Sequence, residues 1–164
     1  MLVVADSSPL IVLANIGHLE ILPHLFGSVI IPPQVSAELQ NPKRPANVRA
    51  MALTPPAWLT IQSPAALETI PALHAGELAA ISLAQELHAD LLLIDEMTGR
   101  KAATERGIRI TGTIGVLELA ADVGLLDLRS AFDLVAATDF WISRELLEER
   151  LRLFLARRGE GGKS

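Results

Sequence analysis

The chain has 164 residues, half of them hydrophobic, no cysteine and a formal net charge of −5. This length fits a single domain that buries about two-thirds of its unfolded surface, so its stability requires neither a disulfide nor a structural metal. The absence of cysteine excludes thiolate metal sites and cysteine nucleophiles. It is also compatible with a reducing compartment, so we expect a cytoplasmic protein.

Two further classes of partner can be weighed from composition. No apolar run reaches the roughly 18 residues that a membrane span requires, so we expect no membrane partner. The negative charge argues mildly against a nucleic-acid binder, because phosphate contacts normally come from a basic surface. This objection weakens if acidic side chains bind divalent cations, which themselves attract phosphate. Positive side chains also cluster at residues 43–49, 100–109 and 144–158, although such clusters are usually solvated helix faces.

The first segment, MLVVADSSPL, carries Asp6 within its apolar stretch and therefore predicts a strand and not a signal peptide. Ser8 and Pro9 then predict the start of a helix, since serine caps helices and proline is favoured at the first helical position. Farther along the chain, short apolar runs alternate with longer helical patterns. This alternation is typical of a parallel sheet with crossover helices.

The patterns predict strands at residues 2–5, 28–31, 58–62, 91–94 and 108–111, with the weakest pattern at 58–62. They predict helices at residues 9–16, 19–26, 33–40, 46–53, 76–88, 96–106, 113–124, 128–136 and 143–157. Six of the ten prolines lie between residues 42 and 71, so we expect this segment to be irregular apart from its short helix. The expected fold class is α/β, a three-layer sandwich around a central parallel sheet. We expect one domain at 1–158 and a flexible tail at 159–164.

Two aspartates follow predicted strands directly. Asp6 ends the first strand and Asp95 ends the strand LLLI, each immediately before a helix. In open parallel sheets, ligands bind beyond the carboxyl ends of the strands, so acidic residues at that edge are candidates for function. Each aspartate alone could instead be a helix cap. Capping explains the pair less completely, because Ser8 can cap the first helix by itself.

Two glutamates on predicted helices are also candidates. Glu77 lies in the first turn of its helix and shares a stripe with Ile81 and Ala84. Its carboxylate must therefore be paired, desolvated at a cost or bound to metal, and a favourable interaction with the helix N-terminus is the open alternative. Glu38 follows Val35 by three residues, which turns it partly toward the sheet, although alone it would be an ordinary surface glutamate.

A family resemblance connects these scattered acids. The segments ADSSPLIVLANIGHLEIL, VIIPPQVSAEL, AGELAAISLAQELHADLLLIDEMTGRKAA and GIRITGTIGVLELA resemble, in their order and spacing, the PIN domain superfamily and in particular its VapC-like branch. The resemblance covers nearly the whole chain except residues 42–71 and the last few. It implies a Rossmann-like, PIN-like fold with an acidic cluster that binds Mg²⁺ or Mn²⁺.

The resemblance also assigns residues. Asp6 corresponds to the family's first aspartate, Glu38 to its glutamate, and Glu77 and Asp95 to its third and fourth acids. Ser7 matches the small hydroxyl residue that often follows the first aspartate. The chain departs from the family at Glu77, where most ribonuclease toxins have aspartate, and this leaves the metal geometry at that position open. Glu96 introduces an ambiguity of register, and we favour Asp95 because it directly follows the strand.

The chemistry of these side chains suits RNA hydrolysis. Hard oxygen ligands favour Mg²⁺ or Mn²⁺ over Zn²⁺, and the four histidines show no metal-ligand spacing. One or two such cations can activate a water and stabilise the leaving oxygen of a phosphodiester, so no covalent nucleophile is needed. We expect Asp6, Glu77 and Asp95 as metal ligands, and Glu38 to orient the water or complete the shell.

Four further residues are candidates for substrate binding. Ser7 and Thr113 can hydrogen-bond the water or the scissile phosphate, although Thr113 could equally cap the helix after Gly112. Arg100 and Lys101 follow Asp95 closely and are the best local candidates for contacts with the RNA backbone. The resemblance further implies an endoribonuclease toxin of a type II toxin-antitoxin pair, neutralised by a small antitoxin protein and often a homodimer.

The alternative to an enzyme is a catalytically degenerate PIN-like module that binds a protein partner. Five apolar residues near the C-terminus offer a candidate surface, although the same helix could pack on its own sheet: Phe140, Trp141, Leu147, Leu151 and Phe154. Other phosphate-handling folds fit less well, because Ser8 replaces the second aspartate of an Asp-x-Asp motif and no acidic pair ends the first strand. Retention of four acids favours the enzyme.

Overall fold

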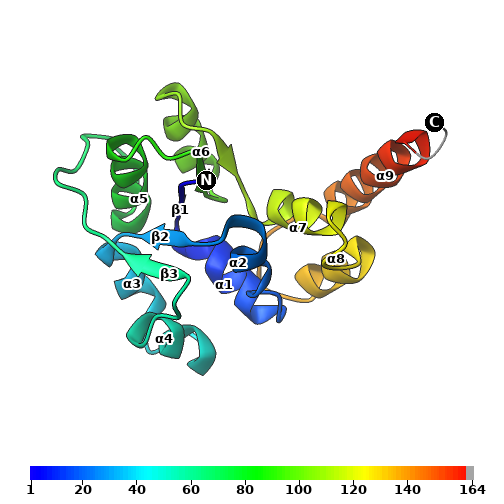
Figure 1. The fold of residues 1–164 in the computed structure, drawn as a ribbon, viewed down its shortest axis with the longest axis horizontal. Coiled ribbons are helices and arrows are strands. Elements are labelled where there is room, and N and C mark those ends of the chain that lie inside the picture. The colour runs from blue at the N-terminus through cyan, green and yellow to red at the C-terminus, as the bar shows by residue number, and fades with distance from the viewer. Residues whose placement is uncertain (162–164) are drawn as a thin grey trace.

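A computed structural model describes residues 1–161 of the chain (Figure 1). Its centre is a five-stranded parallel sheet with the strand order β3-β2-β1-β4-β5. The strands are β1 (Val3–Ala5), β2 (Val29–Ile31), β3 (Leu59–Ile61), β4 (Leu91–Leu93) and β5 (Ile110–Thr111). All five predicted strands are therefore present, each one or two residues shorter than predicted.

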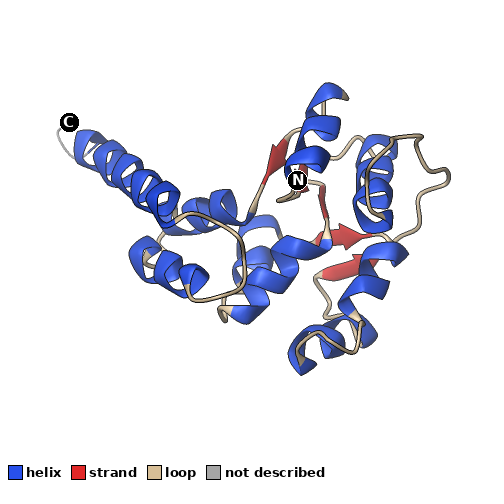
Figure 2. Ribbon diagram, turned by 180° about the vertical axis from the view of Figure 1, so that it is seen from behind, coloured by secondary structure: helices blue, strands red, loops and turns tan. Residues whose placement is uncertain are grey.

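Helices connect and cover the strands. They are α1 (Ser7–Asn15), α2 (Ile21–Phe26), α3 (Pro33–Leu39), α4 (Ala46–Leu53), α5 (Ala75–Glu86), α6 (Met97–Glu105), α7 (Thr113–Asp122), α8 (Leu128–Ala136) and α9 (Arg144–Gly161). The bounds of α4 and α8 are as predicted. The expected fold class is confirmed, because α5 and α6 lie on one side of the sheet and α1 and α2 on the other (Figures 1 and 2).

The chain order of the strands reverses at β1. From β1 the chain adds β2 and β3 on one side, and it later returns to add β4 and β5 on the other. Strands β1 and β4 are consequently neighbours, with Val4 opposite Leu92, and both are completely buried. Their apolar composition explains this position, since strands covered on both faces are nearly continuous hydrophobic runs. The reversal point is where this type of sheet binds ligands.

The start of α1 differs from the prediction. The helix begins at Ser7, so Asp6 occupies the N-cap position, yet the Asp6 side chain makes no capping hydrogen bond. Ser8 lies inside the first turn, and its hydroxyl donates to Asp95 Oδ2 at 3.0 Å. The prediction that Ser8 caps this helix is therefore wrong, because the chain turns into the helix directly after the strand. The capping explanation for Asp6 also fails.

The C-terminal helix α9 extends away from the sheet (Figures 1 and 2) and packs against α8. It runs four residues beyond its predicted end, and the last three residues of the expected tail lie outside the described residues. Leu147 and Phe154 are each only 4% exposed, so this helix packs on its own domain. Of the apolar surface proposed for a partner, Trp141 is the residue that stays fully exposed. No helix within residues 1–161 is long and apolar enough to cross a membrane.

Burial of Phe154 predicts how strongly α9 is attached. Phe154→Ala should lower the free energy of unfolding by about 3 kcal/mol, because phenylalanine-to-alanine changes in a core remove apolar contact and leave a cavity. Leu153→Ala is the matched control, since Leu153 is 41% exposed on the same helix and should change stability by less than about 0.5 kcal/mol. Urea unfolding of both variants measures the difference, and equal midpoints would show that α9 is not anchored through Phe154.

Candidate active site

The fold brings together carboxylates from four distant segments. Asp6 follows β1, Glu38 lies in the last turn of α3, Glu77 lies in the first turn of α5, and Asp95 with Glu96 follows β4. The charges of Glu38, Asp95 and Glu96 all act on Asp6, and those of Glu96, Asp6 and Glu38 act on Glu77. The four predicted acids therefore belong to one acidic cluster, together with Glu96, at the carboxyl edge of the sheet.

Asp6 is the most completely enclosed member of the cluster. It is 4% exposed, and its Oδ1 atom is buried without a hydrogen-bond partner among the described residues. Burial, and then the neighbouring carboxylates, raises the pKa of Asp6 from 3.8 to about 6, although the backbone N–H of Ser7 partly opposes this shift. A buried carboxylate oxygen without a donor is costly. A bound cation would remove that cost.

Glu77 is similarly buried, at 4% exposure. Burial raises the pKa of Glu77 from 4.5 to about 8, with further contributions from a hydrogen bond shared with Glu96 and from nearby negative charges. The positive end of the helix dipole alone would favour the ionised form of Glu77, but burial and the neighbouring negative charges outweigh it. Gly99 allows α6 to lie close to Ile94 and Glu77. A Cβ atom at position 99 would be 3.4 Å from Glu77 Oε2 and would collide with the Ile94 side chain.

Glu38 is held at both carboxylate oxygens. The Ser7 hydroxyl donates to Oε2 at 2.5 Å, and the backbone N–H of Gly76 donates to Oε1 at 3.1 Å. A side chain at position 76 would collide with this carboxylate, so glycine is what allows the start of α5 to reach α3. Glu38 is therefore a half-buried, oriented group and not an ordinary surface glutamate.

Asp95 has a different environment. Thr113 donates its backbone N–H to Oδ1 and its hydroxyl to Oδ2, both at 2.7 Å, and Ser8 also donates to Oδ2. Asp95 thus caps α7 from another segment of the chain, while Glu96 occupies the N-cap of α6 without capping it. Thr113 was a candidate either to bind the water or phosphate or to cap α7. Its hydroxyl is fully buried and donates to Asp95, so it is not free to bind water or phosphate. Gly112 leaves room for Asp95 where a Cβ atom would collide with it.

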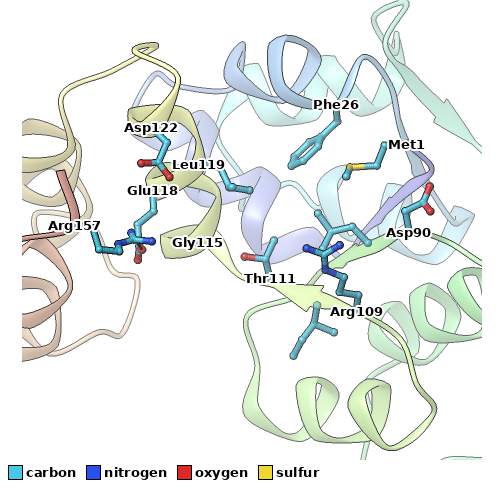
Figure 3. Close-up of a pocket in the computed structure, with 12 residues that line it drawn as sticks. Met1, Phe26, Asp90, Arg109, Thr111, Gly115, Glu118, Leu119, Asp122 and Arg157 are labelled. Carbon is cyan, nitrogen blue, oxygen red and sulfur yellow. Dashed lines mark ion pairs between the residues drawn. The ribbon is translucent and has the colours of Figure 1, made fainter. Parts of the chain in front are cut away.

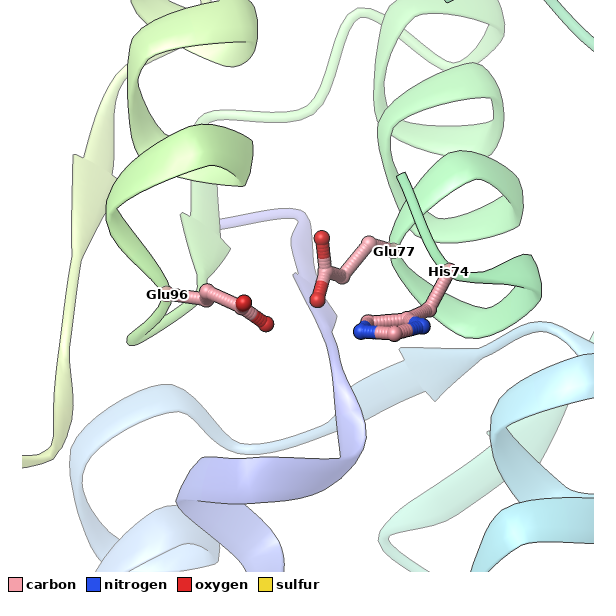
Figure 4. Close-up of side chains that lie close together, drawn as sticks. All are labelled: His74, Glu77 and Glu96. Atoms are coloured by element: carbon pink, nitrogen blue, oxygen red, sulfur yellow. The ribbon is translucent and has the colours of Figure 1, made fainter. Parts of the chain in front are cut away.

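Sequence reasoning missed two residues of this centre. A ring nitrogen of His74 and carboxylate oxygens of Glu77 and Glu96 lie within 4.8 Å of one another (Figure 4). The sequence leaves Asp95 and Glu96 as alternatives, because position after the strand does not reveal which side chain turns toward Glu77. The signal for His74 is its position three residues before Glu77, because an N-cap residue lies beside the third residue of its helix.

The basic residues near the cluster do not neutralise it. Among the described residues, no ion pair involves any of the five carboxylates. Arg100 is half-buried and donates to the backbone oxygen of Ile94 at 3.0 Å, so its guanidinium is partly committed. Lys101 is exposed on the same helix. Of these two predicted RNA contacts, Lys101 is therefore the more available.

A cavity of about 310 Å³ lies away from the acidic cluster (Figure 3). Its lining includes Met1, Asp90 and Arg109, which precede or begin β1, β4 and β5 and therefore mark the amino edge of the sheet. None of the five carboxylates lines it. Parallel sheets of this kind bind ligands at the opposite edge, so the carboxylate cluster is the stronger candidate for chemistry.

The donor set of the cluster fits a hard divalent cation. Carboxylate oxygens are the ligands that Mg²⁺ and Mn²⁺ prefer, and the unpartnered Oδ1 atom of Asp6 is the kind of buried donor that such an ion would satisfy. The cluster is also open on one side, because His74 and Glu96 are exposed while Glu77 is buried. Water and a phosphodiester can therefore reach it.

Comparisons with known proteins give two matches. The family described as "DUF3368: PIN domain" matches residues 2–155. A PilT N-terminus domain protein from the hyperthermophilic archaeon Sulfolobus solfataricus P2 has a similar solved structure, with a TM-score of 0.56 and 18% sequence identity. The likeness covers 77% of this chain and 97% of that chain, and at this identity it concerns the fold alone. No curated protein matches the chain.

The raised pKa of Glu77 predicts a pH-dependent stability. The folded protein holds a proton on Glu77 up to about pH 8, whereas the unfolded chain releases it near pH 4.5. Stability of the metal-free protein should therefore fall as pH rises through this window. Glu77→Gln should remove the part of that fall above about pH 6, where Asp6, whose pKa is about 6, no longer contributes. It should raise the free energy of unfolding by roughly 1–3 kcal/mol above about pH 8, with little difference below about pH 4.

Urea unfolding in a chelator at several pH values measures this effect. Glu105→Gln is the matched control, because Glu105 is exposed at the end of α6 and its charge is not among those acting on Glu77. Wild-type and control proteins should show the same decline. An equal decline in Glu77→Gln would mean that this carboxyl does not titrate as its burial requires.

Proposed function

The chain belongs to the PIN domain family, and we propose that it is a Mg²⁺- or Mn²⁺-dependent endoribonuclease that hydrolyses RNA phosphodiester bonds at the acidic cluster. PIN domains are generally metal-dependent nucleases. One observation carries the proposal for this chain: carboxylates from four segments converge at the reversal point of the sheet, without a cationic partner among the described residues. Such crowding is costly unless a cation joins it.

In this proposal Asp6 and Glu77 hold the metal, together with Glu96 and Asp95 from the segment after β4. Their geometry supports a shared site, since the charge of Glu96 acts on both Asp6 and Glu77. Asp95 stays in the proposed ligand set because its Oδ1 atom accepts one hydrogen bond and retains a second lone pair. A bound divalent cation supplies Lewis-acid chemistry that favours attack of water on phosphorus and departure of the leaving oxygen.

The remaining polar residues position the acids. Glu38, fixed by Ser7 and Gly76, is proposed to orient the attacking water from a defined carboxylate position. Ser7 and Thr113 were expected to contact water or phosphate, but their hydroxyls donate to Glu38 and Asp95. We therefore assign both residues a positioning role.

Substrate contacts are proposed next to the cluster. Lys101 is exposed on α6, the helix that begins beside Glu96, and can contact an RNA phosphate as a flexible point charge. Arg100 is proposed to help more weakly, because it already donates to the Ile94 carbonyl. Sequence-independent contacts of this kind fix the strand and do not select bases.

The cellular role is proposed from the resemblance to the VapC-like branch. The protein would be the toxin of a type II toxin-antitoxin pair in the cytoplasm, neutralised by a small antitoxin, and it would act as a homodimer.

Expression in a bacterial host should arrest growth, and Asp6→Asn should relieve the arrest at equal protein level. Growth arrest that is unaffected by Asp6→Asn would contradict a toxin that acts through this cluster.

The central test is metal-dependent RNA cleavage. Asp6→Asn or Asp95→Asn should reduce cleavage of defined RNAs in Mn²⁺ by roughly 10²-fold or more, because each removes a charge from the proposed ligand set. Circular dichroism should show an intact fold, and a chelator should abolish the wild-type activity. Glu105→Gln serves as the inert control. Full activity in Asp6→Asn would refute the proposed site.

A comparison of two variants separates the roles of Asp95 and Glu96. Glu96→Gln should impair metal binding with little loss of stability, because Glu96 is exposed and makes no capping bond. Asp95→Asn should also destabilise the fold by about 1–3 kcal/mol, since three donors converge on its carboxylate. Calorimetric Mn²⁺ titration and urea unfolding distinguish these effects. A Glu96→Gln variant with unchanged Mn²⁺ affinity would remove Glu96 from the ligand set.

A further inference from the structure

His74 offers an imidazole nitrogen as a possible metal ligand beside the acidic cluster. It occupies the N-cap position of α5 with an extended backbone, and its side chain makes no capping hydrogen bond. Figure 4 shows the imidazole ring directed toward the same space as the carboxylates of Glu77 and Glu96. One ligand atom from each of these three residues lies within 4.8 Å of the other two. The ring is thus beside the candidate metal centre and is not used by the helix.

A second observation points to a cation at this place. Asp6, which is 4% exposed, has a buried Oδ1 atom without a hydrogen-bond partner among the described residues. Its charge acts on Glu77, and the charge of Glu96 acts on Asp6, so the orphaned oxygen belongs to the same cluster. The imidazole therefore lies beside carboxylates that form no ion pair among the described residues.

We propose that His74 supplies an imidazole ligand to the divalent cation held by Glu77 and Glu96, and that this nitrogen donor makes the centre prefer Mn²⁺ over Mg²⁺. The inference deepens the proposed function, on which it rests for the presence of the cation. Mg²⁺ selects hard oxygen ligands and releases its water reluctantly, whereas imidazole binds transition metals. Replacement of one oxygen donor by nitrogen therefore costs Mg²⁺ more than Mn²⁺.

The position of His74 also explains how the ligand reaches the metal. His74 is the N-cap of α5 and Glu77 is its third helical residue, two positions whose side chains lie close together at a helix start. Both His74 and Glu96 are exposed, while Glu77 is buried. The imidazole would thus lie on the exposed side of the centre, which a phosphodiester can reach.

The test uses full-length protein loaded with Mn²⁺ alone and pulsed electron paramagnetic resonance, which detects nitrogen bound to manganese. Wild-type protein and the control His24→Ala should show nitrogen coupling, since His24 is exposed on α2. His74→Asn should lose it. Asparagine is favoured at helix N-caps, so this variant should fold at least as well as the wild type, and His74→Ala provides a second variant.

Calorimetry gives an independent measurement. His74→Ala should weaken Mn²⁺ binding by roughly tenfold or more, since even residues that only support a ligand contribute that much, and it should leave Mg²⁺ affinity nearly unchanged. Absence of nitrogen coupling in the wild type, or equal Mn²⁺ affinities in wild type and His74→Ala, would overturn the inference. RNA cleavage without nitrogen coupling would reject His74 and retain the nuclease. Nitrogen coupling without cleavage would support His74 and reject the nuclease.

Discussion

Burial of neighbouring carboxylates at the reversal point of the sheet is the constraint on which the rest of the site depends. Burial in this position raises the pKa of both Asp6 and Glu77, and each negative charge adds to the cost of the others. No basic residue among those described pairs with the cluster. The uncompensated negative charge destabilises the metal-free site, and a bound divalent cation can offset it. A purely structural site would avoid such a concentration of unpaired carboxylates.

The scaffold holds these groups with small residues and hydroxyls. Gly76 and Gly112 give close approach where a Cβ atom would collide with Glu38 or Asp95, and Gly99 brings α6 to Glu77. Donors from neighbouring helices then orient the carboxylates that are not completely buried. Orientation of this kind lowers the entropic cost of reaching the transition state, because the groups are in place before substrate arrives.

Much of the fold could be predicted from the chain itself. Apolar runs of three to five residues, punctuated by glycine and proline, located all five strands and the nine helices of residues 1–161 within a few residues. Local patterns suffice here because β1 and β4 are buried on both faces and must be almost wholly apolar. Capping was the exception, since Ser8 could cap the helix only if it began two residues later, at Pro9, whereas the tight turn after β1 starts it at Ser7.

The candidate active site could be predicted from the sequence only in part. Sequence alone determined that Asp6 and Asp95 each follow a strand directly, because strand ends are a local property. Helix patterns made Glu38 and Glu77 candidates, and the family resemblance joined the four acids in one site. Which carboxylates face one another was decided by tertiary structure. Thr113 draws Asp95 toward α7 and leaves its neighbour to meet Glu77, and α5 presents His74 beside them. Such choices depend on contacts between separate segments, as between Asp95 and Thr113, which are 18 residues apart in the chain, and no local spacing records them.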